Sequence, residues 1–337
     1  MAHSVSVVVV TFRSAQLTID CLRSVEAERS SSDLGIRAIV IDNASGDFPI
    51  LAEAVEKKGW SSWVTLLLAP RNGGFAYGNN LGIRLALDRD SPDYVLFLNP
   101  DTQVRPGAIA TLARFLEAHP EVGIAGSSFE NLDGSDWPIA FRFPTLISEC
   151  SSALSIGLVT RAFGRWRVAR EMPPVAQPAD WICGASMMIR PEVFRAIGGM
   201  DENYFLYFEE TDFCLRAKRA GFPTWYVPES RVMHIGGQST RVTERNVRPK
   251  RLPAYWFESR RRYFTMAFGA GHAMVIDLLV LLSYPFGWLK RLALRQHHAS
   301  IPYFWRDFAR GSLLRPRNRH FASIRGLREP ARHSRST

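Results

Sequence analysis

The chain has 337 residues, of which 46% are hydrophobic and 22% are charged, and its formal net charge is +10. This composition excludes a disordered or fibrous polypeptide, and the length allows a large core in one domain or two smaller ones. The positive charge is concentrated near the C-terminus, because residues 290–337 contain twelve Lys and Arg but only two acidic residues. Such a tail indicates an anionic partner: a nucleic acid, an acidic membrane surface or a phosphorylated substrate.

Short apolar runs alternate with amphipathic stretches in the first part of the chain. Continuous apolar strands separated by helices are typical of a parallel sheet covered on both faces, so we predict an α/β, doubly wound architecture. In open sheets of this kind, ligands bind beyond the carboxyl ends of the strands. The expected strands are 5–11, 36–42, 64–69 and 94–98, and the expected helices are 14–27, 47–58 and 75–87.

Polar residues stand at the carboxyl ends of the expected strands. Thr11 and Asp42 end the first two strands, Asn72 follows the third, and Asn99 and Asp101 follow the fourth. A carboxylate and an amide oxygen two residues apart can contact one Mg²⁺ ion from the same side. Taken alone, however, Asn-Pro-Asp is more typical of a turn, and a turn or helix-cap role is an equally good interpretation of Asp42.

The stretch from Ala69 to Leu87 is rich in glycine. Gly74, Gly78 and Gly82 are four residues apart and would form one stripe on a helix, where each costs about 1 kcal/mol relative to Ala. The stripe indicates close approach of the backbone to a ligand or to another element, and packing against the sheet is plausible for Gly82. The stretch is neither a P-loop nor a dinucleotide-binding fingerprint, because it lacks the required spacing.

The pattern is less regular in the middle of the chain. Further strand-like runs lie at 122–126, 185–190 and 224–228, and a helix is expected at 211–220. The four cysteines form no CxxC pair and fit no zinc pattern. The N-terminus lacks the basic region and cleavage site of a signal peptide, so we expect a cytoplasmic protein with reduced thiols.

Three acidic residues, Glu209, Glu210 and Asp212, follow an aromatic run at the start of the expected helix. The helix dipole favours acids there, and Asp212 can form an i,i+4 ion pair with Arg216. A carboxylate beside apolar rings has a raised pKa, which suits a general base. His234 ends a strand-like run, and a single histidine in such a place is more often structural than a ligand.

An apolar run, Ala273–Leu289, lies between the basic clusters 260–262 and 290–291. It is marginal for a membrane span, which needs about 20 residues, and Asp277 and Pro285 interrupt it. We interpret it as an interfacial segment on the inner face of the cell membrane, where basic residues meet anionic lipid head groups. The alternative is a buried helical hairpin. A nucleic-acid partner is not expected, because no recognition module accompanies the basic tail.

Several stretches, taken in order, resemble the family-2 nucleotide-sugar glycosyltransferases, which have the GT-A fold. They lie between residues 5 and 240 and include VVVVTF, IDNAS, RNGGFAYGNNLGI, LNPD, GGMDENYFLYFEE and VMHIGGQST. The resemblance implies a mostly parallel sheet with a Rossmann-like nucleotide-binding half. We therefore predict a GT-A domain over residues 1–240, followed by a basic, helical, membrane-associating extension over residues 241–337.

The resemblance implies roles for residues at the strand ends. Asp42 matches the acid that reads the nucleobase. Asn99-Pro100-Asp101 matches the metal-binding DxD motif, with Asn in place of its first acid, and His234 matches a frequent extra ligand of the metal or the pyrophosphate. The implied cofactor is Mg²⁺ or Mn²⁺. The implied nucleotide-sugar site comprises Thr11, Asp42, Asn72, Gly73, Gly74, Asn80, Asn99, Asp101 and Trp181, although core packing is an equally good reading of Trp181.

The implied reaction is an inverting displacement in which Glu210 takes the proton of the acceptor hydroxyl. Glu210 falls at the second position of the Glu-Asp base motif, where Asp is usual, so Glu209 and Asp212 stay candidates for the base. The LNPD form and the GGMDENYFLYFEE block look most like the rhamnosyltransferase branch. Its members move L-rhamnose from dTDP-rhamnose to a lipid-linked or cell-envelope acceptor. A UDP- or GDP-hexose is the alternative donor.

Two other functional classes stay open at this point. A nucleotidyltransferase on a similar sheet also needs carboxylates and a metal, but it would need a Gly-rich phosphate loop directly after the first strand. The sequence TFRSAQ in that place contains one Arg and no Gly. A non-catalytic sugar- or lipid-binding protein would have no use for the acid cluster or for Asn99 and Asp101.

Overall fold

The computed structural model describes residues 3–137, 140–154, 167–170, 172, 174–235, 250–293 and 301–315. The chain forms two compact units: the first comprises residues 1–144 and 166–248, and the second comprises 145–165 and 249–337. The predicted boundary at residue 240 lies outside the described residues and stays a prediction. The segment 145–165, which the sequence analysis leaves in the first domain, clusters with the second unit.

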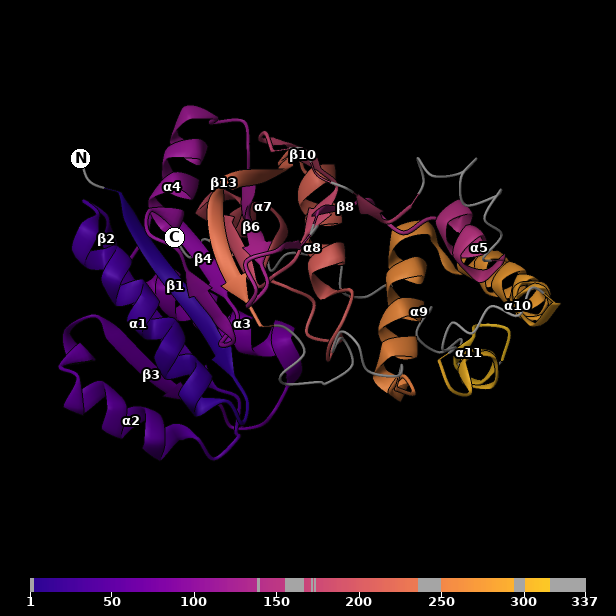
Figure 1. The fold of residues 1–337 in the computed structure, drawn as a ribbon, viewed down its shortest axis with the longest axis horizontal. Coiled ribbons are helices and arrows are strands. Elements are labelled where there is room, and N and C mark those ends of the chain that lie inside the picture. The colour runs from indigo at the N-terminus through magenta and orange to yellow at the C-terminus, as the bar shows by residue number, and fades with distance from the viewer. Residues whose placement is uncertain are drawn as a thin grey trace, which may run out of the picture. The chain divides into compact units, whose positions relative to one another are not determined.

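Four parallel strands form one half of the main sheet of the first unit (Figure 1). β1 (Ser4–Thr11) pairs with β2 (Gly35–Asp42) on one side and with β4 (Tyr94–Leu98) on the other, and β3 (Val64–Leu68) pairs with β2. Their order, β4-β1-β2-β3, is that of a doubly wound sheet. The four predicted strands are thus confirmed, and no boundary differs by more than one residue.

The other half of the main sheet is mixed. β12 (Ser186–Ile189) lies antiparallel to both β4 and β6 (Ile124–Glu130). β13 (Thr224–His234) runs parallel to β6, pairs with β10 (Gln177–Ala179) at the outer edge, and ends antiparallel to the short β5 (Thr102–Val104). The last pairing carries the end of β13 back to the segment that follows β4.

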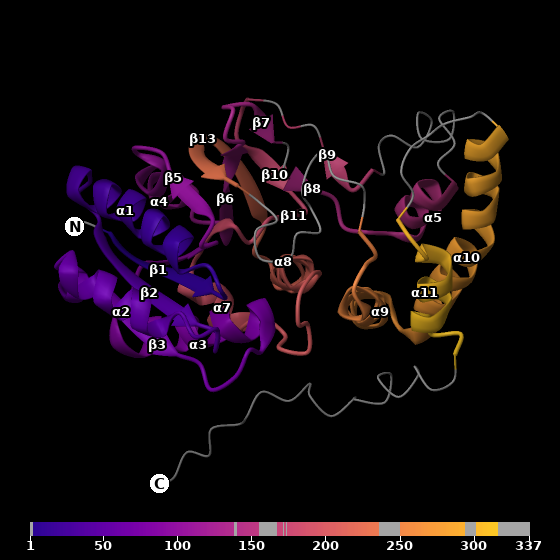
Figure 2. The ribbon, with the colours of Figure 1, turned by 60° about the horizontal axis from the view of Figure 1, so that its bottom comes forward.

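Helices cover both faces of this sheet, as the alternating pattern predicts. Figure 2 shows α1 and α4 over one face and α3 and α7 over the other. The α/β architecture is therefore confirmed, and the expected helices correspond to α1, α2, α3 and α8. The helices of the first unit are α1 (Ala15–Ser31), α2 (Phe48–Lys57), α3 (Gly74–Arg89), α4 (Ala108–Ala118), α7 (Pro191–Ile197) and α8 (Glu209–Arg219), with a short 3₁₀ turn, η1 (Trp60–Ser62).

Four very short strands complete the first unit. β7 (Asp136–Trp137) pairs antiparallel with β6 of the main sheet. β8 (Ala140–Phe141) lies between β11 (Trp181–Ile182) and β9 (Ala169–Arg170) in a separate three-stranded sheet. This small sheet determines where Trp181 lies.

Two of the three spaced glycines allow α3 to lie directly against β1. A Cβ atom at Gly78 would lie 2.5 Å from Cγ1 of Val10, and one at Gly82 would lie 2.3 Å from Cγ1 of Val8. These distances are too short for any side chain larger than hydrogen. Packing of the helix on the strand therefore explains both glycines, and approach to a ligand is not needed.

The second unit is helical. It comprises α5 (Leu146–Leu154), α9 (Ala254–Phe268), α10 (Ala270–Ala293) and α11 (Phe304–Gly311). α10 packs against both α5 and α9, and α11 packs against α9. Contact with α10 explains why α5, whose sequence lies in the middle of the chain, belongs to this unit.

A buried ion cluster joins three helices of the second unit. Arg260 of α9 donates hydrogen bonds to Asp277 of α10 at 2.7 Å and to Glu149 of α5 at 2.7 Å. The backbone N–H of Leu313 donates to the second oxygen of Asp277 at 2.8 Å. The two acids raise the pKa of Arg260, although burial alone would lower it. Asp277, an interruption of the apolar run in sequence, is thus a paired and buried residue that fastens α10 within the unit.

The other side of α10 is exposed and apolar. Five side chains on it are between 45% and 65% exposed, and they follow one another at intervals of three or four residues, which places them on one face. By length and composition, residues 270–289 are sufficient to cross a membrane. The helix thus combines a packed face with an apolar exposed face. The exposed stripe consists of Val275, Leu278, Leu282, Phe286 and Leu289.

Candidate active site

The carboxyl ends of the parallel strands meet at one edge of the sheet, as the sequence predicts. Thr11 lies opposite Asp42 in the register of β1 and β2. β4 ends beside them, and Asn99 and Asp101 follow at the same edge. Residues that are far apart in the sequence thus share the edge where doubly wound sheets bind ligands.

The carboxylate of Asp42 is buried and engaged within its own turn. One oxygen accepts hydrogen bonds from the backbone N–H of Ser45 at 2.9 Å and from its hydroxyl at 2.6 Å. The other oxygen accepts from the N–H of Phe48 at 3.0 Å, at the start of α2. This geometry is that of the turn and helix-cap interpretation, and the nucleobase role of Asp42 stays a prediction.

Asn43 links two strand-end loops, and the sequence analysis did not identify it. Its amide donates to the side chain of Asn72 at 3.1 Å and to the carbonyl of Gly74 at 3.1 Å, and its oxygen accepts from the N–H of Gly73. The signal was its position directly after Asp42 in the IDNAS stretch. Asn72, Gly73 and Gly74 are therefore held in a single loop against the end of β2.

Gly74 is required by two features of the loop at the start of α3. Its φ angle is +86°, which favours glycine. A Cβ atom at Gly74 would lie 1.9 Å from the carbonyl oxygen of Phe205. The same oxygen accepts a hydrogen bond from the backbone N–H of Phe75 at 3.0 Å. The start of α3 is thus attached to the aromatic run that precedes the acid cluster.

Thr11 and Asn80 hold protein groups in place. The hydroxyl of Thr11, fully buried, accepts a hydrogen bond from Thr18 at 2.9 Å and pairs with Ser14 at 3.0 Å. The side-chain N–H of Asn80 donates a hydrogen bond to the carbonyl of Met200 at 2.8 Å, and the side-chain oxygen of Asn80 accepts one from the backbone N–H of Met200 at 2.8 Å. Both residues thus fix loops near the site, and their predicted contact with the nucleotide sugar stays a prediction.

Asp101 and His234 form a buried pair across the β5–β13 junction. Their nearest side-chain atoms, Oδ1 and Nε2, are 3.3 Å apart, and only 7% of Asp101 and 6% of His234 is exposed. The imidazole stacks on Trp137, with ring centroids 5.2 Å apart. Its Nδ1 is buried without a hydrogen bond to any part of the chain that the structure describes. The backbone pairing of His234 with Thr102 produces this arrangement.

The acid cluster begins α8 directly after two residues in the left-handed region. Tyr207 has φ +71° and Phe208 has φ +68°, which is uncommon for aromatic residues and characteristic of functional sites. Glu209 is buried and Glu210 is half-buried. One carboxylate oxygen of each is buried without a hydrogen bond to any described residue.

The pKa values of this acid pair are shifted in the direction that suits a base. Burial, and then the charge of Glu210, raise the pKa of Glu209 well above its usual value. Burial raises the pKa of Glu210, and a hydrogen bond from the backbone of Gly184 offsets part of this effect. Asp212 differs, because its carboxylate accepts a 2.7 Å hydrogen bond from Arg216, which is the predicted i,i+4 ion pair.

Cys183 lies close to both groups of acids. Burial raises the pKa of its thiol to about 12, and the charges of Glu210, Asp101 and Glu209 raise it as well. The charges of all three carboxylates thus act on this one thiol. Trp181, two residues earlier, stacks on Phe141 with ring centroids 4.2 Å apart, so the packing interpretation of Trp181 accounts for one of its faces.

The donors at the strand end are of the kind that a divalent cation takes. Among the described residues, no group of three or more His, Cys, Asp and Glu is arranged around a metal. Mg²⁺ and Mn²⁺ in phosphate-transfer sites need only one or two protein ligands, because the phosphate oxygens supply others. The carboxylate of Asp101 beside the imidazole of His234 fits this requirement, with Asn99 as a neighbouring amide.

Family models match most of the chain. The model of glycosyl transferase family 2 matches residues 6–149, and that of glycosyl transferase family group 2 matches residues 94–315. The chain belongs to the family-2 glycosyltransferases. The fold is therefore that of a glycosyltransferase, and this membership decides against a nucleotidyltransferase or a non-catalytic binding protein.

Curated relatives assign the glycosyltransferase to the rhamnosyltransferase-like branch. The N-acetylglucosaminyl-diphospho-decaprenol L-rhamnosyltransferase of Mycobacterium tuberculosis is 30% identical over 217 residues, which cover 61% of this chain and 68% of that protein. The rhamnosyltransferase WbbL of Escherichia coli is 26% identical over 171 residues, covering 50% and 63%. The dTDP-rhamnosyl transferase RfbF of Shigella flexneri is 26% identical over 186 residues, covering 55% and 56%.

Solved structures agree on the fold. The mannosyltransferase PcManGT from Pyrobaculum calidifontis, solved with GDP-Man and Mn²⁺, matches with a TM-score of 0.53 and 16% identity, over 90% of this chain and 77% of that one. GalNAc-T7, solved with UDP, GalNAc and Mn²⁺, matches with a TM-score of 0.52 and 15% identity, over 92% and 57%. At these identities the likeness shows the GT-A fold alone.

Proposed function

We propose that this glycosyltransferase moves L-rhamnose from dTDP-L-rhamnose to a lipid-linked saccharide acceptor in cell-envelope polysaccharide synthesis. The observation that carries the proposal is the name shared by its relatives, three of which are rhamnosyltransferases from different bacteria. One of those names contains a diphospho-decaprenol acceptor and another contains the dTDP donor. A different donor hexose is the second candidate, because the relative Agl10 of Haloferax volcanii is named a hexosyltransferase.

Asp101, His234 and Asn99 are the proposed holders of Mg²⁺ or Mn²⁺ together with the donor diphosphate. When bound, the cation neutralises the negative charge that develops on the leaving diphosphate. The 3.3 Å contact between His234 and Asp101 supports this role, and stacking on Trp137 helps to hold the imidazole beside the carboxylate.

Glu210 is the proposed general base of an inverting displacement. Its carboxylate takes the proton of the acceptor hydroxyl as the oxygen attacks the anomeric carbon, and no covalent enzyme intermediate forms. The raised pKa of Glu210 supports the assignment, and so does its carboxylate oxygen that has no hydrogen bond to any described residue. Glu209 also has a raised pKa, but its side chain is more deeply buried. The carboxylate of Asp212 already accepts a hydrogen bond from Arg216.

The nucleotide is proposed to lie along the strand-end loops. Asn43 and Asn72 hold Gly73 and Gly74 in the loop that follows β3. Asp42, Thr11 and Asn80 are proposed to line this region of the nucleotide-sugar site. Trp181 is the proposed wall for the sugar ring, because one face of its indole is already covered by Phe141.

The exposed stripe of α10 is proposed to rest on the cytoplasmic face of the membrane. The stripe supplies apolar contact, and the basic C-terminal sequence supplies attraction to anionic lipids. We propose that α10 inserts shallowly into the membrane and does not cross it, because the carboxylate of Asp277 is bound to Arg260 inside the second unit. This attachment would bring the enzyme to a lipid-linked acceptor.

A panel of nucleotide sugars tests the donor and the metal together. We expect dTDP-L-rhamnose with Mn²⁺ or Mg²⁺ to raise the melting temperature more than UDP-glucose or GDP-mannose, and chelation to remove the effect. Asp101→Ala should lose the metal-dependent part and keep the fold. Equal donor affinity of wild type and Asp101→Ala in the presence of metal would contradict the role of Asp101 as a metal ligand. A larger rise in melting temperature with another nucleotide sugar would contradict dTDP-L-rhamnose as the donor. The anomeric configuration of the product, read by NMR, tests inversion.

A further inference from the structure

Arg13 lies in the loop that follows β1, the strand at which the order of the main sheet reverses. β2 and β3 lie on one side of β1, and β4 lies on the other. Doubly wound sheets bind their ligands at this reversal, beyond the carboxyl ends of the strands. Val9 of β1 pairs with Leu98 of β4, so the loops that carry Arg13 and Asp101 leave neighbouring strands at the same edge.

Contacts on both sides of Arg13 fix the course of this loop. The N–H of Ser14 donates to the carboxylate of Asp47 at 2.7 Å, and the carbonyl of Thr11 accepts the N–H of Asn43 at 2.9 Å. Arg13 itself has φ +53°, in the left-handed region, which is uncommon for any residue other than glycine. Such conformations persist where the surrounding structure imposes them, and they cluster at ligand-binding sites.

The guanidinium of Arg13 has no polar partner among the residues that the structure describes. Its side chain is exposed and lies over the ring of Phe12, with Cζ 5.2 Å from the ring centroid. Contact with a ring face uses none of the five N–H donors of a guanidinium. An anion can therefore be bound through all of these donors without loss of a protein contact.

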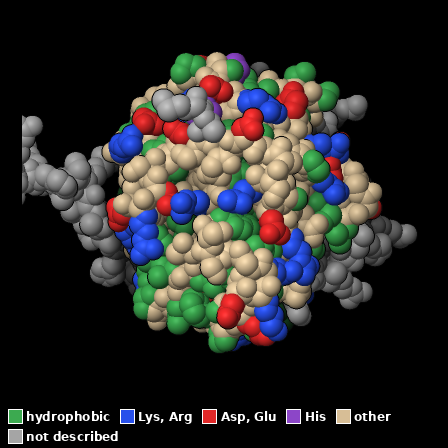
Figure 3. Space-filling model, turned by 90° about the vertical axis from the view of Figure 1, so that its left-hand side faces the viewer, with side chains coloured by type: hydrophobic (Ala, Val, Ile, Leu, Met, Phe, Trp, Pro, Cys, Tyr) green, Lys and Arg blue, Asp and Glu red, His purple; other side chains and the backbone are tan. Residues whose placement is uncertain are grey.

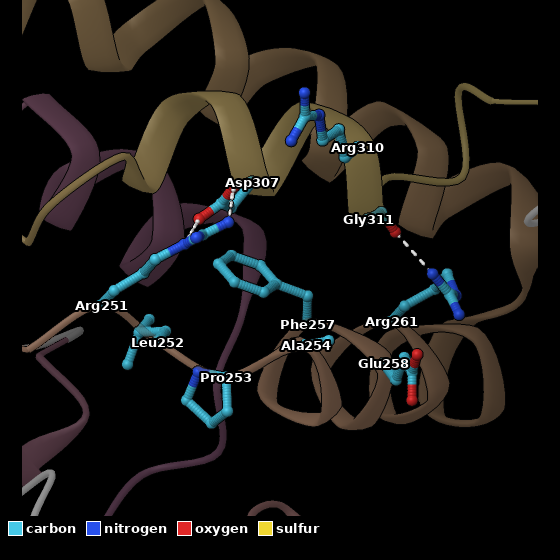
Figure 4. Close-up of a pocket in the computed structure, with 10 residues that line it drawn as sticks. All are labelled: Arg251, Leu252, Pro253, Ala254, Phe257, Glu258, Arg261, Asp307, Arg310 and Gly311. Atoms are coloured by element: carbon cyan, nitrogen blue, oxygen red, sulfur yellow. Dashed lines mark hydrogen bonds and ion pairs between the residues drawn. The ribbon is translucent and has the colours of Figure 1, made fainter.

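Arginines in the second unit differ, because the protein already engages them. In a pocket of about 520 Å³ between α9 and α11, Arg251 donates to both oxygens of Asp307 at 2.6 and 3.0 Å (Figure 4). In the same pocket Arg261 donates to the carbonyl of Gly311 at 2.7 Å. These guanidinium groups hold the helices of the second unit together, whereas that of Arg13 serves no such contact in the described chain.

The strand-end edge contains little other positive charge. The loops that follow the four parallel strands carry two basic residues, Arg13 and Arg71. Arg71 is also exposed, and its Cζ lies 4.5 Å from the ring centroid of Tyr77. It follows β3, however, which β1 and β2 separate from β4 and from the proposed metal residue Asp101. The loops comprise residues 12–14, 43–47, 69–73 and 99–101.

We propose that Arg13 binds the diphosphate of the nucleotide-sugar donor. The inference rests on the proposed function in expecting a nucleoside diphosphate whose phosphates lie near Asp101. A planar guanidinium can donate to two phosphate oxygens at once, which makes Arg well suited to this contact. Arg13 thereby makes donor affinity depend on the diphosphate, and it stabilises the charge that develops there when the glycosidic bond breaks.

Calorimetric titration of the full chain with dTDP, in the presence of Mn²⁺, tests the proposal. We expect Arg13→Asn to weaken dTDP binding about tenfold or more, because hydrogen bonds to a charged group are lost. Binding of thymidine, measured by ligand-observed NMR, should be unchanged. Asn adopts the left-handed conformation more readily than most residues, so this variant keeps the loop. Arg13→Lys should lose less, because it keeps the charge but not the planar arrangement of donors.

Arg71→Gln is the matched control, since it removes the same charge from another exposed loop of the same edge. Its dTDP affinity should change little. Three results would overturn the proposal: normal dTDP affinity in Arg13→Asn, an equal loss in Arg71→Gln, or an equal loss of thymidine binding in Arg13→Asn. The second would mean general electrostatic attraction, and the third would mean a contact with the nucleoside.

Titration with UDP and GDP separates this inference from the proposed function. Tighter binding of UDP or GDP than of dTDP, with the same loss in Arg13→Asn, would contradict dTDP-L-rhamnose as the donor and support the role of Arg13. Unchanged diphosphate affinity in Arg13→Asn, together with rhamnosyl transfer by the wild type, would contradict the role of Arg13 alone. Failure of the wild type to bind any of the three diphosphates would also overturn the inference.

Discussion

Individual residues in the acid cluster differ in what surrounds them, and this separates three neighbouring carboxylates by role. Asp212 is neutralised by Arg216, which also donates to the carbonyls of Ile197 and Gly199. Glu209 and Glu210 instead have raised pKa values and an oxygen without a partner in the described chain. A structural acid is stabilised in its charged form, whereas a base must be ready to accept a proton.

Exchange of each acid for its amide should separate these roles. We expect Glu210→Gln to lower kcat by about 10²–10⁴-fold with little change in donor affinity, the usual effect of removing a positioned base. Asp212→Asn should mainly lower the melting temperature, because it weakens the contact with Arg216 that holds the start of α8. Turnover and thermal unfolding measured on both variants provide the check. Normal turnover in Glu210→Gln with loss in Asp212→Asn would mean that the base is Asp212.

Stability should respond to pH through Glu209. Its pKa is raised in the folded state, so between the ordinary carboxyl pKa and the raised value the folded protein holds more protons than the unfolded one. Stability therefore falls as the pH rises through this interval. We expect Glu209→Gln to raise the melting temperature at about pH 8. At about pH 4 it should change the melting temperature little, because the Glu209 carboxyl is then mostly protonated in both the folded and the unfolded protein. The control is Glu53→Gln, since Lys57 lowers the pKa of exposed Glu53, and that variant should not be stabilised at the higher pH.

At the scale of elements, the N-terminal half of the sheet is held together by close contact of α3 with β1. The glycine stripe that suggested a ligand-binding helix serves mainly this contact, and only Gly74 lies in the loop beside the aromatic run. Because α3 begins in that loop, a shift of the helix would also move Gly73 and Asn72 at the strand ends. Packing and site geometry are thus coupled through one helix.

Gly82→Ala tests this packing role. A Cβ atom 2.3 Å from Val8 forces the helix away from the strand, and overpacking of this kind typically costs about 1–3 kcal/mol. We expect a lower melting temperature and a lower denaturant midpoint. Gly271→Ala in α10 is the control, because open space surrounds that position and Ala favours helices. Equal stability of Gly82→Ala and the wild type would show that the packing contact is not limiting.

For the whole molecule, charge and apolar surface are distributed unevenly over the chain. On the side of the first unit that Figure 3 shows, basic and acidic side chains are interspersed and form no single patch. The excess of Lys and Arg lies instead in residues 290–337, and the apolar stripe lies on α10. Both features that favour a lipid surface therefore belong to the second unit.

Vesicle flotation tests attachment to the membrane. We expect binding to anionic vesicles that weakens at high salt, since each basic residue near such a surface contributes about 1 kcal/mol. Leu282→Glu and Phe286→Glu should reduce binding, whereas Ile50→Glu, at an equally exposed apolar position of α2, should not. Binding to neither anionic nor neutral vesicles would contradict the membrane proposal and favour the buried hairpin. Salt-resistant binding to both would indicate a true span.

The sequence by itself determined the α/β class, the first four strands, and the helix that begins with the acids. These features depend on local periodicity, which the chain carries in adjacent residues. It also determined that Thr11, Asp42, Asn99 and Asp101 share one edge, because parallel strands all end on the same side.

Only the tertiary structure decided which polar groups meet and which are already engaged. His234 reaches Asp101 because β13 pairs with β5, and Asp42 is satisfied by its own turn. Asp277 changes from an obstacle in an apolar run to a partner of Arg260. Such contacts join residues that are distant in sequence or depend on the exact course of a loop. Hydrophobic periodicity contains no information about either, whereas strand register and helix packing determine both.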